Sequence, residues 1–316
     1  MKRLFDLVKW LGLVVLVLAV SSYVIARSGL KELDQQARAE LGGNYLNTAG
    51  GVLSYTRQGP EHAPVVILVH GFSTPKFVWE QVTPILLAAG YQVITYDHLG
   101  RGFSDRPNGP YDSALYRGEL SDLIAGLQLA TPLTLVGYSM GGANVIDFAA
   151  SNLSLIKQLV LIAPAGYLPD NGSVSLLSTP VLGEWLATVF VKQYALASIR
   201  QEVEAGLAPG DMVDKFEQQA RYDGYAHALL STARHFPMSD LADRYRIVGS
   251  TGLPVTAIWG TDDQIVPFSG AAAMLQDVAQ LKLVTLEGGN HNITYARAAE
   301  VAAGLVAALN EIHLKR

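Results

Sequence analysis

Ser139 lies in the stretch Gly137-Tyr138-Ser139-Met140-Gly141, a G-x-S-x-G pattern that follows an apolar run and precedes a stretch of helical character. A strand that turns sharply into a helix at a serine strains the backbone and holds the hydroxyl where a base and a substrate can reach it. Only small residues fit where strand and helix nearly touch, and Gly137 and Gly141 stand at those points. The N–H of Met140 then points from the start of the helix and can donate to an oxyanion. Because the chain has 30 glycines, the pattern could also match by chance. The rest of the sequence decides between a catalytic serine and a chance match.

A carboxylate and a histidine that could act with this serine follow two later apolar runs. Asp262 and Asp263 come after the run 254–259, and His291 comes after the run 281–286. An imidazole beside a serine hydroxyl accepts its proton, and a carboxylate orients the imidazole and stabilises its cation. The spacing alone leaves both aspartates open as the acid. An aspartate without this role is expected to be a turn residue whose side chain caps the backbone.

The composition describes a protein with a large core and no affinity for nucleic acid. The chain has 316 residues, of which 50% are hydrophobic and 16% charged, so disorder is not expected. The formal net charge is −5 and no basic run lies in the globular part, so nothing suggests a nucleic-acid surface. The absence of cysteine excludes disulfides, zinc–thiolate sites and a cysteine nucleophile.

Apolar runs alternate with stretches of helical spacing from residue 44 onward. The pattern predicts a hairpin over 45–57 and further strands over 65–69, 91–96, 133–136, 157–163, 254–259 and 281–286. It predicts helices over 77–89, 114–129, 143–150, 269–279 and 296–309. Strands that alternate with helices form a parallel sheet with helices on both faces. The expected fold class is therefore α/β, with a doubly wound, mostly parallel sheet.

Four stretches together resemble the α/β-hydrolase superfamily, and within it the serine esterases and lipases. These stretches are His70-Gly71-Phe72, the loop 97–104, the turn at Ser139, and the loops of Asp263 and His291. In that family the site lies at the carboxyl ends of the strands, and each of these stretches follows an expected strand. The family's acid stands three residues after a glycine. The resemblance therefore implies a catalytic triad of Ser139, His291 and Asp263 rather than Asp262.

The resemblance also assigns the remaining roles in the site. The backbone N–H groups of Phe72 and Met140 are the expected oxyanion donors. Neither a metal nor an organic cofactor is expected. His70 precedes the turn at Gly71 and is expected to fix that loop by hydrogen bonds. His98 lies in a glycine-rich loop, where turn chemistry is expected to account for it.

These residues predict a serine hydrolase that cleaves carboxylic esters, lipid-like ones among them, through an acyl-enzyme. A C–C bond hydrolase or a haloperoxidase-like enzyme with the same triad is the alternative. A third hypothesis, a catalytically idle binding protein, is disfavoured by an intact triad. Ser139 also disfavours dehalogenases and epoxide hydrolases, which have an aspartate at this position.

An insertion between the sixth and seventh strands lies where the family carries a cap. Its segment 174–191 is strongly apolar, but Pro180 and Glu184 interrupt it, which argues against a second membrane span. We expect this segment to form a buried cap helix, with a lipid-touching lid as the alternative. Further cap helices are expected over 195–217 and 218–236.

The N-terminal segment is expected to lie outside the fold. Lys2, Arg3 and Lys9 precede an uncharged apolar run over 10–26. The length of this run is at the short end of the roughly 17–25 residues that are needed to span a bilayer. The run is longer than the roughly 7–15 apolar residues of a typical signal peptide, which favours an anchor, and the basic residues before it favour an extracytoplasmic catalytic domain. A cleaved signal peptide is the alternative. A polar helical linker over 27–43 follows.

The expected organisation has four parts. They are an anchor or signal segment with its linker (1–43), a first core segment (44–166), a helical cap (167–250) and a second core segment (251–316).

Overall fold

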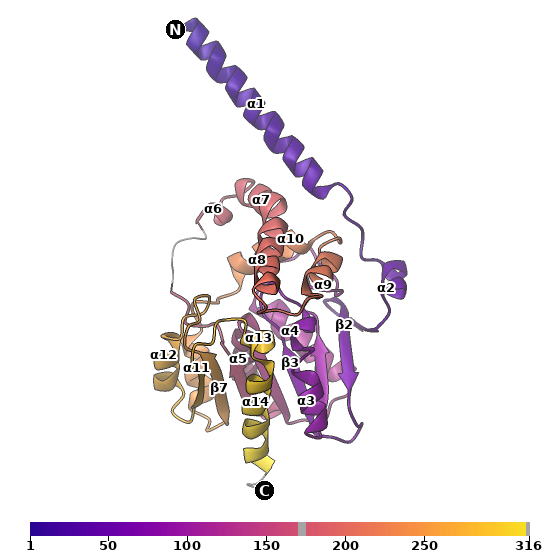
Figure 1. Cartoon of the computed structure of the whole chain (residues 1–316), viewed down its shortest axis with the longest axis vertical. Coiled ribbons are helices and arrows are strands. Elements are labelled where there is room, and N and C mark those ends of the chain that lie inside the picture. The colour runs from indigo at the N-terminus through magenta and orange to yellow at the C-terminus, as the bar shows by residue number, and fades with distance from the viewer. Residues whose placement is uncertain (170–174, 314–316) are drawn as a thin grey trace.

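Eight strands form one twisted sheet in the order β1-β2-β4-β3-β5-β6-β7-β8 (Figure 1). The structure is a computed structural model that describes residues 1–169 and 175–313. The strands are β1 (Asn44–Thr48), β2 (Gly51–Gln58), β3 (Val65–Val69), β4 (Gln92–Tyr96), β5 (Leu133–Tyr138), β6 (Ile156–Ile162), β7 (Val255–Gly260) and β8 (Lys282–Leu286). The pairs β1–β2 and β2–β4 are antiparallel, and the other neighbours are parallel. The predicted doubly wound, mostly parallel sheet is confirmed.

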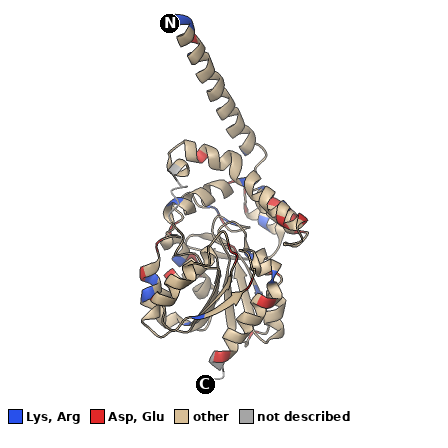
Figure 2. Cartoon of the chain, turned by 60° about the vertical axis from the view of Figure 1, so that its left-hand side comes forward, with Lys and Arg blue, Asp and Glu red and all other residues tan. Residues whose placement is uncertain are grey.

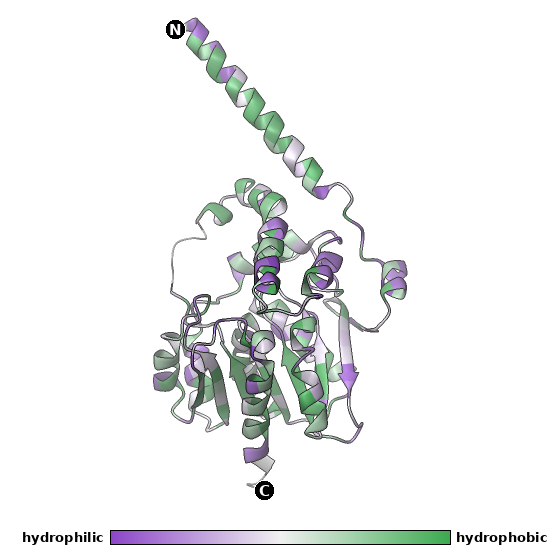
Figure 3. Ribbon diagram, in the orientation of Figure 1, coloured by the Kyte–Doolittle hydropathy of each residue, from purple (hydrophilic) through white to green (hydrophobic). Residues whose placement is uncertain are grey.

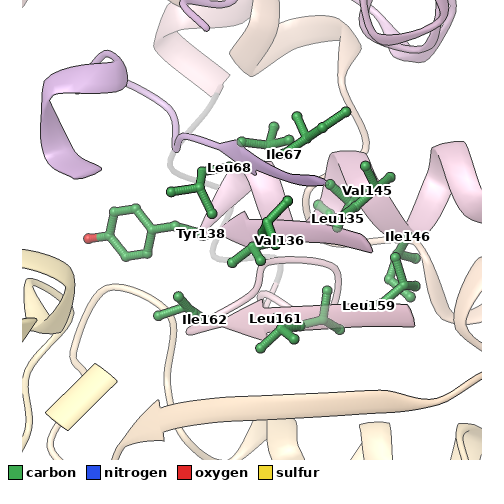
Figure 4. Packing of buried hydrophobic residues seen from close by; sticks show 14 of the residues in the cluster. Ile67, Leu68, Leu135, Val136, Tyr138, Val145, Ile146, Leu159, Leu161 and Ile162 are labelled. Atoms are coloured by element: carbon green, nitrogen blue, oxygen red, sulfur yellow. The ribbon is translucent and has the colours of Figure 1, made fainter. Parts of the chain in front are cut away.

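The central strands are continuous apolar runs because helices cover them on both faces. Every residue of β4, β5 and β7 is buried. Figure 4 shows side chains of neighbouring strands packed together with those of α5 (Met140–Ser151), and the labelled ones are Ile67, Leu68, Leu135, Val136, Tyr138, Val145, Ile146, Leu159, Leu161 and Ile162. This packing gives the loops at the strand ends a rigid base.

The helices that flank the sheet form two groups (Figure 1). On one face α3 (Thr83–Ala88) packs against α14 (Ala298–His313). On the other face lie, in contact from neighbour to neighbour, α4 (Ser113–Gly126), α5 (Met140–Ser151), α11 (Ala242–Gly249) and α12 (Gly270–Asp277). α11 belongs to this flanking layer although it precedes β7 in the chain.

The helix predicted over 77–89 is wrong as a single element. The chain forms a 3₁₀ turn, η1 (Lys76–Trp79), and then α3, which begins at Thr83 with Pro84 in its first turn. A proline is accepted there because its missing N–H has no partner in a first turn, whereas inside a longer helix it would remove a hydrogen bond. The proline therefore separates the two elements.

Between β6 and β7 the chain forms several helices, most of which lie together above the sheet in Figure 1. We call those before α11 the cap helices: α6 (Ser175–Ser178), α7 (Leu182–Leu186), the π-helical turn η3 (Ala187–Val191), α8 (Lys192–Glu204), α9 (Met212–Gln219) and α10 (Tyr225–His235). The helix expected over 195–217 is two helices, because Pro209 and Gly210 separate α8 from α9.

The single buried helix expected over 174–191 is also wrong. Val174 lies outside the described residues, and the rest forms α6, α7 and η3, with Val181 at φ +70° between the first two. Pro180 cannot donate a helical hydrogen bond, so the chain turns there. Exposure exceeds 50% at Leu176, Val181 and Phe190, so much of the segment's apolar surface meets solvent.

The N-terminal helix α1 (Lys2–Arg27) extends away from the rest of the chain (Figure 1). Its middle carries no charged residue (Figure 2), most of its length is hydrophobic (Figure 3), and none of its residues is buried. By length and composition this helix could cross a membrane, and a signal sequence would have the same features. Its last turns touch the cap, where Trp185 Nε1–H donates to Ala19 O at 2.9 Å and Ser22 Oγ at 3.1 Å. A short helix, α2 (Gln35–Leu41), occupies part of the expected linker.

Candidate active site

Ser139 occupies the turn between β5 and α5. Its backbone has φ +56° and ψ −122°, a strained conformation for a residue with a side chain. A Cβ added to Gly137 would lie 2.3 Å from the carbonyl oxygen of Gly141, so no larger residue fits at that crossing. The glycine spacing therefore has the steric cause expected from the sequence.

His291 lies between Ser139 and Asp263. Its Nε2 lies 2.9 Å from Oγ of Ser139, and its Nδ1 lies 2.8 Å from Oδ2 of Asp263. The other carboxylate oxygen, Oδ1, accepts the N–H groups of Ile265 at 2.9 Å and Val266 at 2.8 Å. With the carboxylate fixed, the Nδ1–H tautomer of His291 donates to it and leaves Nε2 to accept the hydroxyl proton.

The two neighbouring aspartates have different environments. The carboxylate of Asp263 is buried, and it alone of the pair hydrogen bonds to His291. Asp262 is exposed, its Oδ1 accepts the hydroxyl of Thr261 at 3.3 Å, and its N–H donates to Gly289 O at 2.9 Å. Asp262 thus lies in a turn, as considered from the sequence, but its carboxylate accepts a side-chain hydroxyl rather than a backbone N–H.

The N–H of Phe72, on the loop after β3, and that of Met140, the first residue of α5, lie beside Ser139. A Cβ on Gly71 would lie 3.1 Å from Cβ of Ser139, so the loop that carries Phe72 is in close contact with the serine. In the part of the chain that the structure describes, neither N–H donates to a protein acceptor. Both donors are therefore free to bind a negatively charged oxygen.

Two buried histidines hold the loop that carries Phe72. The N–H of His98 donates to Nε2 of His70 at 2.9 Å, so Nδ1 carries the proton that His70 donates to Gly71 O at 2.9 Å. Burial, the largest cause, and the neighbouring His98 keep the pKa of His70 well below its usual value. This hydrogen bonding agrees with the structural role expected for His70.

Turn chemistry does not account for His98, which corrects the expectation from the sequence. Its ring is fully buried, Nε2–H donates to the carbonyl of His70 at 3.0 Å, and Nδ1 pairs with the carboxylate of Glu119. The second oxygen of Glu119 accepts the N–H of Leu99 at 2.9 Å. Glu119 was missed because it lies inside the predicted helix 114–129, where a glutamate is ordinarily a surface residue.

A second residue missed from the sequence, Arg101, supports the same loop from the other side. Its Nε–H donates to the carbonyl of Phe72 at 2.9 Å, and Nη2 donates to Oγ1 of Thr232 on α10 at 2.8 Å. The guanidinium is fully buried and lies over the rings of Phe72 and Tyr111 at 5.5 and 5.8 Å. Arg101 thus links the Phe72 loop to the cap helices.

A cavity of about 700 Å³ adjoins Ser139, His291 and Phe72. Most of its wall is apolar, and the cap helices supply Leu176, Leu177, Leu186, Phe190, Val191 and Ile199. Among its described lining residues the charged or titratable ones are His291, Glu202 and three tyrosines. In the described ranges, 1–169 and 175–313, no group of three or more His, Cys, Asp or Glu side chains is arranged to hold a metal ion.

Fold and sequence together define the class of this protein. Residues 66–304 match the model of the Alpha/beta hydrolase family, and the chain belongs to that family. Monoacylglycerol lipase ABHD6 of Homo sapiens is 24% identical over 273 residues, which cover 81% of this chain and 78% of the lipase. The non-heme chloroperoxidase of Streptomyces lividans is 25% identical over 265 residues, which cover 79% of this chain and 93% of that enzyme. The crystal structure of a membrane phospholipase A shares the fold, with a TM-score of 0.68, 21% identity and 99% of each chain covered.

Proposed function

We propose that this α/β-hydrolase cleaves carboxylic esters with apolar acyl groups, and that Ser139, His291 and Asp263 are its catalytic triad. The observation that carries the proposal is the line of hydrogen bonds from Asp263 through His291 to Oγ of Ser139. That line ends at the wall of a largely apolar cavity, where a hydrocarbon chain gains roughly 0.8 kcal/mol per buried CH₂. A relative named as a monoacylglycerol lipase agrees with this substrate class.

The geometry supports a two-step reaction through an acyl-enzyme. Nε2 of His291 takes the proton of Ser139 as Oγ attacks the acyl carbon, and the buried carboxylate of Asp263 stabilises the resulting imidazolium. The N–H groups of Phe72 and Met140 stabilise the oxyanion, where one lost donor typically costs about 10²–10³ in kcat. His291 then gives its proton to the leaving alcohol, and water repeats the sequence on the acyl-enzyme.

We also propose that α1 anchors the enzyme in a membrane, with the catalytic domain on the extracytoplasmic side. Support comes from the long apolar helix with its basic residues at the start. An anchor keeps the site where lipophilic esters concentrate. A cleaved signal would leave the same domain extracytoplasmic but free of the membrane.

The substrate class is tested with the detergent-solubilised full chain and p-nitrophenyl acetate, butyrate, octanoate and palmitate. We expect kcat/KM to rise over the first few carbons, by up to about fourfold per CH₂ if each is fully buried. The Ser139→Ala variant, which lacks the attacking oxygen, serves as the control for background hydrolysis.

A steady fall of kcat/KM from acetate onward would contradict the preference for apolar acyl groups. Halogenation, or cleavage confined to carboxylated diketones, would move the chain to the alternative haloperoxidase or C–C hydrolase reactions. The relative named as a chloroperoxidase makes both assays worth running beside the ester series.

A further inference from the structure

One polar ridge interrupts the apolar wall of the cavity beside Ser139. It consists of Tyr194, Ser198 and Glu202, which stand four residues apart on α8 and therefore share one face of that helix. All three line the cavity, flanked by apolar residues of the same helix such as Ile199. Tyr194 and Ser198 are exposed and Glu202 is partly buried, so the ridge leads from solvent toward the interior.

Glu202 is held in place by one neutral partner. The hydroxyl of Tyr295 donates to its Oε2 at 2.8 Å. In the described part of the chain, no Lys, Arg or His lies within ion-pair distance of this carboxylate, and Oε1 accepts no protein hydrogen bond. A carboxylate in this position accepts hydrogen bonds from a ligand and repels an anionic one.

The ridge lies on the side of the site where an alcohol would leave. Tyr138 stacks on the ring of His291 with centroids 5.1 Å apart and donates its hydroxyl to the carbonyl of His291 at 2.9 Å. Burial raises the pKa of Tyr138, and the charges of Asp263 and then Glu202 add to the effect. Tyr138, Glu202 and Tyr295 line the same cavity. Tyr295 follows His291 on the short helix α13 (Ile293–Ala296). Because His291 must hand its proton to the leaving oxygen, the alcohol portion of an ester lies next to these residues.

We propose that Glu202 is a specificity-determining residue that binds hydroxyl groups on the alcohol portion of the substrate. The preferred substrate is then an ester with an apolar acyl group and a polyhydroxylated alcohol, with Tyr295 positioning the carboxylate and Ser198 offering a second hydroxyl partner. The hydroxyls of Tyr194 and Ser198 on the ridge offer further hydrogen bonds, which a polyol can share and a quaternary ammonium group cannot. This inference rests on the proposed esterase function and names the substrate class of the same site.

Three butyrate esters that differ only in the alcohol test the inference: propyl butyrate, 1-butyroylglycerol and butyrylcholine. All are assayed on the full chain in detergent below their own aggregation limits, with release of butyric acid followed by titration. We expect kcat/KM for 1-butyroylglycerol to exceed that for propyl butyrate by about tenfold, the effect of a hydrogen bond to a charged group. The Glu202→Gln variant should bring this ratio toward one, because it lowers kcat/KM for 1-butyroylglycerol more than kcat/KM for propyl butyrate.

Two further variants separate recognition from a merely structural tie between α8 and α13. Tyr295→Phe frees the carboxylate and should lower the same ratio, while Glu204→Gln, at an exposed position two residues away, should leave it unchanged. A loss shared equally by all three esters in Glu202→Gln would assign the residue a structural role and overturn the inference.

The failure of this inference is distinguishable from the failure of the proposed function. If propyl butyrate is hydrolysed in a Ser139-dependent manner but the ratio is near one in the wild type, or unaffected in Glu202→Gln, the inference alone is wrong. A preference for butyrylcholine without one for 1-butyroylglycerol also overturns it, in favour of cationic alcohols. If the wild type hydrolyses no ester, both are wrong.

Discussion

At the scale of single residues, the sharpest prediction follows from the hydrogen bonds that join Asp263, His291 and Ser139. Ser139→Ala and His291→Ala should each lower kcat for a soluble ester by about 10⁴-fold or more, because these groups act as a unit. Circular dichroism and the thermal midpoint should stay near wild type, since neither change opens the core. Near-full turnover by Ser139→Ala would contradict the mechanism.

The neighbouring aspartates provide a matched comparison in the same assay. Asp263→Asn keeps the shape of a side chain that is buried against His291 but removes its charge, and should cost several orders of magnitude in kcat. Asp262→Asn changes an exposed turn residue and should cost less than about twofold. If Asp262→Asn were the worse variant, the assignment of the acid would be wrong.

The buried His70 leads to a prediction about the stability of the fold rather than the rate of the reaction. Its pKa in the folded state is well below the ordinary value of 6.5, so the unfolded chain binds more protons in the interval between the two. The free energy of unfolding therefore rises with pH through this interval, and the His70 contribution is lost as pH falls below about 6.5. Urea unfolding of wild type and His70→Gln from about pH 8 to about pH 5 isolates the effect, since the variant lacks this titration. A difference between the two proteins that is independent of pH would contradict the role of His70.

The residues that the sequence could predict share one property, namely that each follows a strand in a short loop. Ser139, Asp263 and His291 could be named because their local patterns are distinctive and the carboxyl ends of parallel strands meet at one edge of a sheet. Glu202 and Arg101 could not, because the packing of the cap decides what they touch. Their signals, a glutamate or an arginine in a polar stretch, are those of ordinary surface residues.

At the scale of elements, the core was more predictable than the cap. Every predicted strand is present, because a strand buried on both faces needs a continuous apolar run. The cap has no such repeat, and its short helices begin and end at Pro180, Pro209 and glycines whose effect depends on tertiary contacts. The apolar pattern over 174–191 therefore predicts one buried helix, where the described residues 175–191 form three short elements.

The α7 helix offers a matched pair of leucines for testing acyl recognition. Leu186 lines the cavity, whereas Leu182, one turn earlier, is exposed and does not. Leu186→Ala removes contact surface from a long acyl chain and should lower kcat/KM for p-nitrophenyl octanoate by about tenfold, with acetate changed by less than about twofold. Leu182→Ala should leave the ratio of octanoate to acetate unchanged. Equal losses on both esters in Leu186→Ala would show that α7 supports the fold rather than the acyl group.

At the scale of the whole molecule, the N-terminal helix contacts the rest of the chain through its last turns. These turns pack against η3, Trp185 donates to Ala19 and Ser22, and Arg27 forms an exposed ion pair with Asp223. An exposed pair of this kind contributes about 0–1 kcal/mol. The chain after α1 has its own attachment, because the N–H of Lys31 donates to Arg221 O at 2.8 Å. We therefore expect the fold to persist without α1.

This independence gives the last prediction, which concerns a chain that begins near residue 30. The full chain should pellet with membranes and resist high-salt extraction, because an apolar helix rather than surface charge holds it there. The truncated chain should remain in the supernatant, unfold within about 1 kcal/mol of the detergent-solubilised full chain, and keep its kcat/KM for p-nitrophenyl butyrate, since no residue of α1 is buried or lines the cavity. Its activity on long-chain esters embedded in vesicles should fall, because it no longer stays where such substrates concentrate. A mature N-terminus at Ser22 or Arg27, read by protein sequencing, would instead identify α1 as a cleaved signal and contradict the anchor.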